Sequence, residues 1–526
     1  MRKPKSFVFG AAILAAASIL VKIIGAFYKI PLGAILGPVG MADFSIAYNI
    51  YALLFVISTA GVPSAVSKLI SESEARGRTG DMLRIYRVAY CSFALIGAAG
   101  FFVMFFFSHQ ISVAMGSPSA GLAVRAISPA VLFVTLSAVN RGYFQGRSDM
   151  VPTAVSEVVE AVGKLCAGLL CAMYLRKLGF GESIVAAGAV FGVSIGALFS
   201  FLWLSLRKDR PGGEKKSAYA GYREITKKLF VLAIPITAGA AVMSLTNVID
   251  SAMCLKLMQK SGFSEYRSKW LFGAYTYATC IFNLPTGMIT TLSVPLIPAL
   301  SSLAAGKDKK KLSGTTGDGV FIAMAIAFPA TAGILAMSRE IMDFLYGSSI
   351  GSECIGMSAK LLGILSLAVI PLSLTTVTNA IHQALGRADI PLRSMIYGAF
   401  FKLICNFLLV GRRGINIYGA AISTVICYVI ISVLNVVALR KYSFLRQNIF
   451  KNFIKLVVIG VSTYASVRAC LALGKVLFAP RILTVLAIFV GVATCGGTAF
   501  MTGAVDEDVK KRIFSKKRIL NFFDND

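Results

Sequence analysis

The chain has 526 residues, of which 56% are hydrophobic and 15% are charged, and it carries a formal net charge of +29 with a mean hydropathy of +0.75. This composition leaves little sequence for a soluble domain and indicates a polytopic α-helical membrane protein. The basic residues lie mainly in loops, where membrane topology and attraction to anionic lipid headgroups account for them, so we expect no nucleic-acid partner.

Fourteen apolar stretches run from Phe7 to Gly503, each long enough to cross about 30 Å of hydrocarbon as a helix. The first continues to Leu36 and further spans follow, so it is a span and not a signal peptide. The expected spans are 7–36, 44–70, 83–108, 122–145, 151–175, 183–206, 226–258, 271–302, 316–338, 357–385, 391–411, 416–439, 449–473 and 481–503.

The charge of the loops predicts the orientation in the membrane. Most of the 53 lysines and arginines lie in the two termini and in the loops that follow even-numbered spans. The positive-inside rule therefore places both termini in the cytoplasm. The expected location is the bacterial plasma membrane.

A repeated sequence indicates two related halves. Gly-Arg-x-Asp at 146–149 leads into a span that contains Lys164, and the same pattern at 386–389 leads into a span that contains Lys402. Six spans per repeat is an even number, so both copies enter the membrane in the same orientation. Transporters built from such parallel repeats bind substrate between two lobes and alternate access by rocking them.

The repeat predicts the domain boundaries. These are an N-terminal lobe at 1–206, a basic cytoplasmic linker at 207–228, a C-terminal lobe at 229–440, spans thirteen and fourteen within 441–503, and a basic cytoplasmic tail at 504–526.

Ionisable side chains inside spans are costly in lipid, so they are expected to face a cavity or a partner. Lys22 and Lys29 are two helical turns apart on one face of span one, and Asp43 opens span two within reach of either. Two alternatives stay open: Lys29 can extend to the membrane interface, and Asp43 can complement a helix dipole.

Span five carries three charges on one face. Glu157, Glu160 and Lys164 follow the spacing i, i+3, i+7, and Glu160 can pair with Lys164 within the helix. The second repeat keeps Lys402 without matching acids, so net positive charge accumulates on the second lobe.

A polar group in span seven predicts a coupling site. Asn247 and Asp250 lie one turn apart, and Asn406 in span eleven is a candidate third member, with Ser423 or Thr424 as a hydroxyl donor. A carboxylate with amide oxygens suits a hard cation or a proton relay. Hydrogen bonding between helices is the alternative.

Motifs of enzymes and pumps are missing. The sequence has no Walker A run, no HExxH, no GxSxG in a strand–turn–helix context and no Cys or His spacing typical of a metal site. We therefore expect a transporter and not an enzyme, with no bound cofactor.

Several short sequences, taken in order, carry a family resemblance. They are SILVKIIGAFYK at 18–29, GPVG at 37–40, AYN at 47–49 and GVPSAVSK at 61–68. They resemble the polysaccharide-biosynthesis/stage V sporulation protein B family of the multidrug/oligosaccharidyl-lipid/polysaccharide exporter superfamily, close to the MurJ-type lipid II flippases. The resemblance spans the chain, including the fourteen spans and the repeat.

The resemblance implies an all-α, MATE- or MurJ-like fold, with two six-helix lobes around a cationic cavity and two C-terminal helices. It implies substrate contacts from Lys22, Lys29, Asp43, Asn49, Lys164 and Lys402. Relatives with a sodium site use an acid similar to Asp250 and an asparagine similar to Asn406, but their second acid is Val410 here. Coupling through Asp250, Asn247 and Asn406 to Na⁺ or H⁺ therefore stays open, and proton or membrane-potential coupling is favoured.

The resemblance also implies a function. The expected activity is movement of an undecaprenyl-pyrophosphate-linked saccharide from the inner to the outer leaflet by alternating access, with lipid II for vegetative wall or spore cortex first and capsule or teichuronic-acid units second. The alternatives are a cation-coupled multidrug antiporter and a membrane scaffold. Expected partners are the lipid-linked oligosaccharide, membrane lipids and cell-wall synthesis proteins. A basic cavity would indicate a flippase, and an acidic one a drug exporter.

Overall fold

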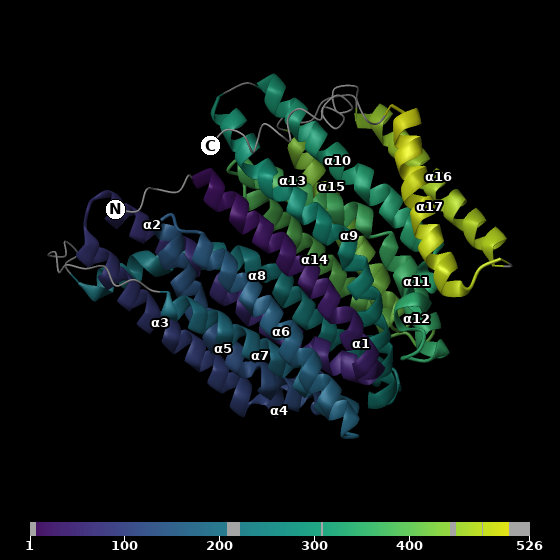
Figure 1. Ribbon diagram of the computed structural model, residues 1–526, viewed down its shortest axis with the longest axis horizontal. Coiled ribbons are helices and arrows are strands. Elements are labelled where there is room, and N and C mark those ends of the chain that lie inside the picture. The colour runs from purple at the N-terminus through teal and green to yellow at the C-terminus, as the bar shows by residue number, and fades with distance from the viewer. Residues whose placement is uncertain (1–6, 208–220, 307–308, 442–448, 476, 504–526) are drawn as a thin grey trace.

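The computed structural model describes residues 7–207, 221–306, 309–441, 449–475 and 477–503 (Figure 1). Within these ranges every regular element is a helix, as expected where backbone polar groups must be satisfied without water. The helices are α1 (Phe7–Thr59), α2 (Val62–Ala75), α3 (Thr79–Phe106), α4 (Ser108–Ala114), η1 (Pro118–Ala120), α5 (Gly121–Gly146), α6 (Val151–Lys177), α7 (Glu182–Leu206), α8 (Tyr222–Lys260), α9 (Glu265–Ala305), α10 (Lys309–Ala336), α11 (Ser338–Tyr346), α12 (Ser352–Ser366), α13 (Val369–Ala384), α14 (Asp389–Val410), α15 (Tyr418–Lys441), α16 (Ile449–Gly474) and α17 (Pro480–Met501).

The expected number of fourteen spans is not confirmed. Among the described residues eleven helices are long and apolar enough to cross a membrane, and the bent pair α12–α13, which meets at 47°, raises the number to twelve. The first two expected spans form a single run, Ala16–Ala75, in which α1 continues past a kink at Gly37. The long helix α9 covers the eighth expected span and is not among these eleven.

Gly37 and Glu182 hold the kink in α1. Gly37 has φ 71° and ψ 174°, a conformation that L side chains rarely adopt, and a Cβ there would lie 2.9 Å from Glu182 Oε1. The break frees backbone N–H groups at the start of the second arm of α1, and the N–H of Gly40 donates to Glu182 Oε2 at 3.0 Å. Glu182 therefore caps that arm at the positive end of its dipole.

The helices form two lobes, α1–α7 and α8–α15. Figure 1 shows the first in purple and blue at the lower left and the second in green at the upper right, with α1 running between them. Accordingly α1 packs on α5, α6 and α7 and also on α8 and α9. We call the end of the lobes that contains α4, η1 and α11 the α4 end, and the opposite end, with the turn after α2, the α2 end.

Both lobes have the same pattern of neighbours, which supports the predicted repeat. In the first lobe α3 packs on α5, and α7 packs on both α5 and α6. In the second α10 packs on α13, and α15 packs on both α13 and α14. Arg147 lies in the turn between α5 and α6, and Arg387 lies in the matching turn between α13 and α14.

The predicted basic linker and tail fall mostly outside the described residues. Of the linker at 207–228 the structure describes Arg207 and the part from Gly221 onward, where α8 begins earlier than expected, at Tyr222. The tail at 504–526 lies outside the described ranges. The lobe boundaries stay predictions.

Helices α1 and α9 touch through their backbones near the α4 end. A Cβ at Gly273 of α9 would overlap the carbonyl oxygen of Pro38, so only glycine fits at this crossing. Nearby, the hydroxyl of Tyr277 donates to the carbonyl oxygen of Gly33 at 2.7 Å. This crossing fixes the two lobes against each other.

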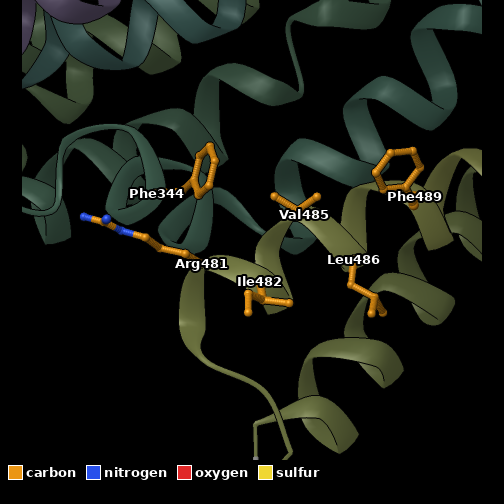
Figure 2. A pocket seen from close by; sticks show the side chains of 6 residues that line it. All are labelled: Phe344, Arg481, Ile482, Val485, Leu486 and Phe489. Atoms are coloured by element: carbon orange, nitrogen blue, oxygen red, sulfur yellow. The ribbon is translucent and has the colours of Figure 1, made fainter.

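Helices α16 and α17 pack on each other, α16 also on α10 and α17 on α11, at the outer side of the second lobe (Figure 1). A pocket of about 430 Å³ lies beside the first turns of α17 (Figure 2). It is lined by Phe344, Arg481, Ile482, Val485, Leu486 and Phe489. Its walls are apolar except for the guanidinium of Arg481, as suits the chain of a membrane lipid.

We predict that Gly37→Ala lowers the midpoint of thermal unfolding of the purified protein in detergent. The substitution places a Cβ in left-handed backbone and against Glu182, at a cost of roughly 1–2 kcal/mol for the backbone alone. Gly25→Ala is the control, because Gly25 lies in the same helix and a Cβ added there would meet nothing within 4 Å. Equal midpoints for the two variants would contradict the role given to Gly37.

Candidate functional site

A polar cavity of about 180 Å³ lies between the two lobes. Its walls come from α1 on one side and from α8, α9, α14 and α15 on the other. The lining residues are Lys29, Met41, Phe44, Ser45, Tyr48, Asn49, Asn247, Asp250, Ser251, Phe272, Tyr275, Thr276, Thr279, Cys280, Phe282, Asn283, Lys402, Thr424 and Tyr428. Of the predicted site residues it therefore brings together Lys29, Asn49, Asn247, Asp250 and Lys402.

Two lysines approach one aromatic ring in the wall of this cavity. The ammonium of Lys29 lies 5.5 Å from the ring centre of Tyr48, and that of Lys164 lies 6.0 Å from it and 5.7 Å from the ring centre of Tyr28. Neither lysine forms an ion pair with a described residue. The negative faces of the rings attract both ammonium groups without neutralising them.

Lys22 lies outside the lining of the cavity, at the boundary of the lobes. Its side chain is exposed, and its ammonium is 3.5 Å from the carbonyl oxygen of Gly287 in α9. Two helical turns separate it from Lys29 along α1. The two lysines thus follow the same interface from the cavity towards the α2 end.

Asp250 lies in a buried cluster that joins three helices. Lys402 Nζ is 3.0 Å from Asp250 Oδ2, and both side chains are 8% exposed. The amide nitrogen of Asn406 donates to Asp250 Oδ1, and Ser423 Oγ donates to the amide oxygen of Asn406 at 2.5 Å. The predicted grouping of Asp250, Asn406 and a span-twelve hydroxyl is observed, with Lys402 as an unforeseen member.

Asn49 and Asn247 meet the same serine across the lobes. Asn49 Nδ2 donates to Ser251 Oγ at 2.9 Å, and that hydroxyl donates to the backbone oxygen of Asn247 at 2.8 Å. The side chain of Asn247 lines the cavity. Asn49 therefore links α1 to α8 beside the cavity.

The predicted pairing of Glu160 with Lys164 is replaced by an ion pair between helices. Arg141 Nη2 of α5 lies 2.8 Å from Glu160 Oε2 and donates to Ser200 Oγ at 3.0 Å. The guanidinium of Arg141 is buried between α5, α6 and α7 and donates to Glu160 and to Ser200 at the same time. It is therefore a better partner for Glu160 than a lysine on the same helix face. Lys164 is thus left near the ring of Tyr48, behind the residues that line the cavity.

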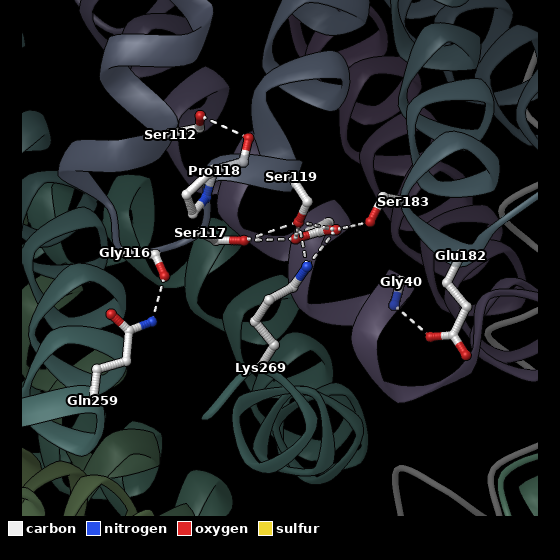
Figure 3. A network of polar contacts seen from close by, with 11 residues as sticks. Gly40, Ser112, Gly116, Ser117, Pro118, Ser119, Glu182, Ser183, Gln259 and Lys269 are labelled. Carbon is white, nitrogen blue, oxygen red and sulfur yellow. Dashed lines mark hydrogen bonds and ion pairs between the residues drawn. The ribbon is translucent and has the colours of Figure 1, made fainter. Parts of the chain in front are cut away.

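Asp43 is not among the residues that line the cavity, and it forms the centre of a polar network at the α4 end. Figure 3 shows the partners Ser117, Ser119, Ser183 and Lys269 of this network. The carboxylate of Asp43 is fully buried and lies 2.9 Å from Lys269 Nζ of α9, which is 5% exposed. Ser117, Ser119 and Ser183 also donate to it, from the loop after α4, from η1 and from α7. This network joins the lobes, since Asp43 and the serines belong to the first and Lys269 to the second.

A second contact closes the same end. Gln259 Nε2 of α8 donates to the carbonyl oxygen of Gly116 at 2.7 Å (Figure 3). At the α2 end the lobes also touch: Phe93 and Phe230 have ring centres 5.7 Å apart, and Gly61 lies against Ala233 and Thr237. The cavity is therefore bounded at both ends by contacts between lobes.

Sequence reasoning missed Lys269, Tyr48 and Arg141. Lys269 falls in the loop between the expected spans 226–258 and 271–302, but it lies in the first turns of α9 with its ammonium buried. The position of Asp43 within the membrane could have predicted such a partner. A buried carboxylate requires a cation, and the helix of Asp43 does not supply one. No group of three His, Cys, Asp or Glu side chains that could hold a metal occurs among the described residues.

Comparison with known proteins gives one family. The family model described as polysaccharide biosynthesis protein matches residues 7–304, more than half of the chain. The lipid II flippase MurJ of Bacillus subtilis is 27% identical over 440 residues, covering 80% of each chain. Stage V sporulation protein B of the same organism is 25% identical over 455 residues, covering 83% of this chain and 84% of the relative.

A solved structure shares the fold. The lipid II flippase MurJ in an inward closed conformation superposes with a TM-score of 0.73 at 16% identity, covering 94% of this chain and 99% of that chain. The expected MurJ-like all-α fold is confirmed.

We predict that Lys269→Ala strongly destabilises the protein. It leaves Asp43 buried without its cation, and breaking a buried pair from one side costs about 3–5 kcal/mol. The double variant Lys269→Ala/Asp43→Asn should recover part of the loss, because the charge is then removed. Thermal unfolding in detergent measures this, with Lys260→Ala, an exposed lysine of α8, as the neutral control. A Lys269→Ala midpoint equal to that of the control would refute the assignment.

Proposed function

Because the chain belongs to the polysaccharide biosynthesis protein family, we propose that it is a flippase that moves an undecaprenyl-pyrophosphate-linked saccharide from the inner to the outer leaflet. The chain is a multi-pass membrane transporter and not an enzyme, like its relatives. We propose lipid II, for vegetative wall or spore cortex, as the substrate. The names of two relatives, a lipid II flippase and a stage V sporulation protein, support this choice.

The uncompensated positive charge at the cavity carries the proposal. The cavity lining contains two lysines and one acid, and Lys402 already neutralises Asp250. Lys29 has no acidic partner among the described residues, and Lys164 adds a second such cation at the ring of Tyr48. Charge-assisted contacts to phosphate are strong in a site of low dielectric constant, so a pyrophosphate suits this wall.

The same charges argue against a cation-coupled drug antiporter. A cationic drug would need a free carboxylate in the cavity, and Asp250 is the acid among the lining residues. Both of its oxygens are occupied, by Lys402 and by Asn406. The sign of the cavity therefore favours an anionic substrate.

The size of the cavity supports alternating access. At about 180 Å³ it is smaller than the roughly 300–1,000 Å³ of ordinary ligand pockets, so a saccharide headgroup needs more room than this cavity offers. Admission of a headgroup requires the lobes to separate at one end. We propose that the α2 end faces the cytoplasm, with both chain termini, and that the Asp43–Lys269 network breaks when the α4 end opens.

We predict that Lys29→Ala and Lys164→Ala each weaken binding of a lipid pyrophosphate about 10- to 100-fold. Each loses one charge-assisted contact, worth roughly 1.5–3 kcal/mol. Lys177→Ala is the matched control, because Lys177 is an exposed lysine in the last turn of the same helix as Lys164. Binding of undecaprenyl pyrophosphate to protein in nanodiscs measures the effect; unchanged affinity in both cavity variants would exclude the proposed pyrophosphate site.

The substrate itself is tested by transport. Proteoliposomes that contain the full chain and lipid II should expose the lipid headgroup on the opposite leaflet, and the chain should support growth of a bacterium depleted of its own lipid II flippases. Movement of a capsule or teichuronic-acid precursor without lipid II movement would assign the other glycan. Export of cationic drugs without either would overturn the proposal.

A further inference from the structure

The cluster around Asp250 has the composition of a cation site. It gathers a carboxylate, an amide and hydroxyls from α8, α14 and α15, donors of the kind that hard cations prefer in proteins. Further hydroxyls, those of Tyr275 and Thr424, lie 3.2 Å apart beside it in the cavity wall. The composition alone therefore suits Na⁺.

The contacts of this cluster leave no place for a metal ion. Lys402 Nζ lies 3.0 Å from Asp250 Oδ2, so the ammonium forms a charge-assisted hydrogen bond on the side of the carboxylate where a metal ion would bind. Asn406 presents its N–H to the carboxylate and engages its oxygen with Ser423, so no amide oxygen faces the acid. One helical turn after Asn406 lies the fully buried side chain of Val410, which adds no second negative charge to the cluster.

We propose that Lys402 is a built-in cation, whose ammonium holds α8 to α14 in the position that a transported Na⁺ would otherwise occupy. A carboxylate and an ammonium sum to zero charge, and a metal ion added beside them would be repelled by the ammonium in a medium of low dielectric constant. The second lobe is therefore complete without a bound alkali cation, and its energetics do not depend on Na⁺.

One consequence rests on the proposed flippase function. Lys402 and Asp250 both line the cavity, so a phosphate that enters competes with Asp250 for the same ammonium. Substrate binding then replaces the Lys402–Asp250 ion pair with an ion pair between Lys402 and the phosphate. No Na⁺ has to be released from the protein in this exchange. The stability of the protein in different salts is measured without transport, so failure of the built-in cation is distinguishable from failure of the proposed function.

The test compares thermal unfolding of the full chain in detergent in sodium chloride and in choline chloride at equal ionic strength. The native protein should have the same midpoint in both salts. Lys402→Met keeps the volume of the side chain but leaves Asp250 without its cation, so its midpoint should fall in choline and rise with the logarithm of Na⁺ concentration. The rise should vanish in Lys402→Met/Asp250→Asn.

Lys29→Met is the matched control, because Lys29 lines the same cavity without a carboxylate partner among the described residues, and its midpoint should ignore Na⁺. Na⁺-specific stabilisation of the native protein would overturn the proposal. So would a folded Lys402→Met that ignores Na⁺, K⁺ and Li⁺. If Lys402→Met yields folded protein only when purified with Na⁺, the proposal is supported; failure to fold in every salt counts against it.

Discussion

Compensation of buried charge is the constraint on which the arrangement of the lobes depends. A carboxylate inside the hydrocarbon thickness is stable only beside a cation and neutral donors. Asp43 and Asp250 both meet this condition, but with different consequences. The lysine of Asp43 belongs to the other lobe, so separation of the lobes breaks that pair. The lysine of Asp250 belongs to the same lobe, so that pair can move as a unit.

Aromatic rings stabilise lysine side chains that have no acidic partner beside the cavity between the lobes. Lys29 and Lys164 approach Tyr48 from two helices of the first lobe and are attracted to its face without being neutralised. The protein thereby concentrates positive potential where the lobes meet, while its acids are occupied elsewhere. This division between paired and unpaired cations, and not the net charge of +29, gives the cavity its sign.

The structure places several of the charged residues singled out from the sequence at the cavity or at contacts between the lobes, but with partners that the sequence did not predict. Apolar length and the repeated Gly-Arg-x-Asp predicted two lobes, helical spacing singled out Lys164 and Asp250, and the position of Asp43 at the start of a span singled out that residue. Partners on other helices were not accessible, because contacts such as Asp43 with Lys269 join residues 226 positions apart. Lys402 was assigned to substrate for the same reason. The kink in α1 between the first two expected spans depends on the conformation of Gly37, which hydropathy does not report.

Given the proposed alternating access, the tight crossing of α1 and α9 at Pro38 and Gly273 would act as a fulcrum for opening of the α2 end. Gly273 leaves no side chain between the two backbones, so direct backbone contact sets the distance between the helices at this point. Lys22 lies sixteen residues before Pro38, a lever arm of about 24 Å at 1.5 Å per residue. A rotation of about 10° at the fulcrum then moves the region of Lys22 by roughly 4 Å, while the crossing itself hardly shifts. Such a rotation would widen the α2 end while the Asp43–Lys269 network beside the crossing stays closed, so opening of the α4 end requires a separate movement.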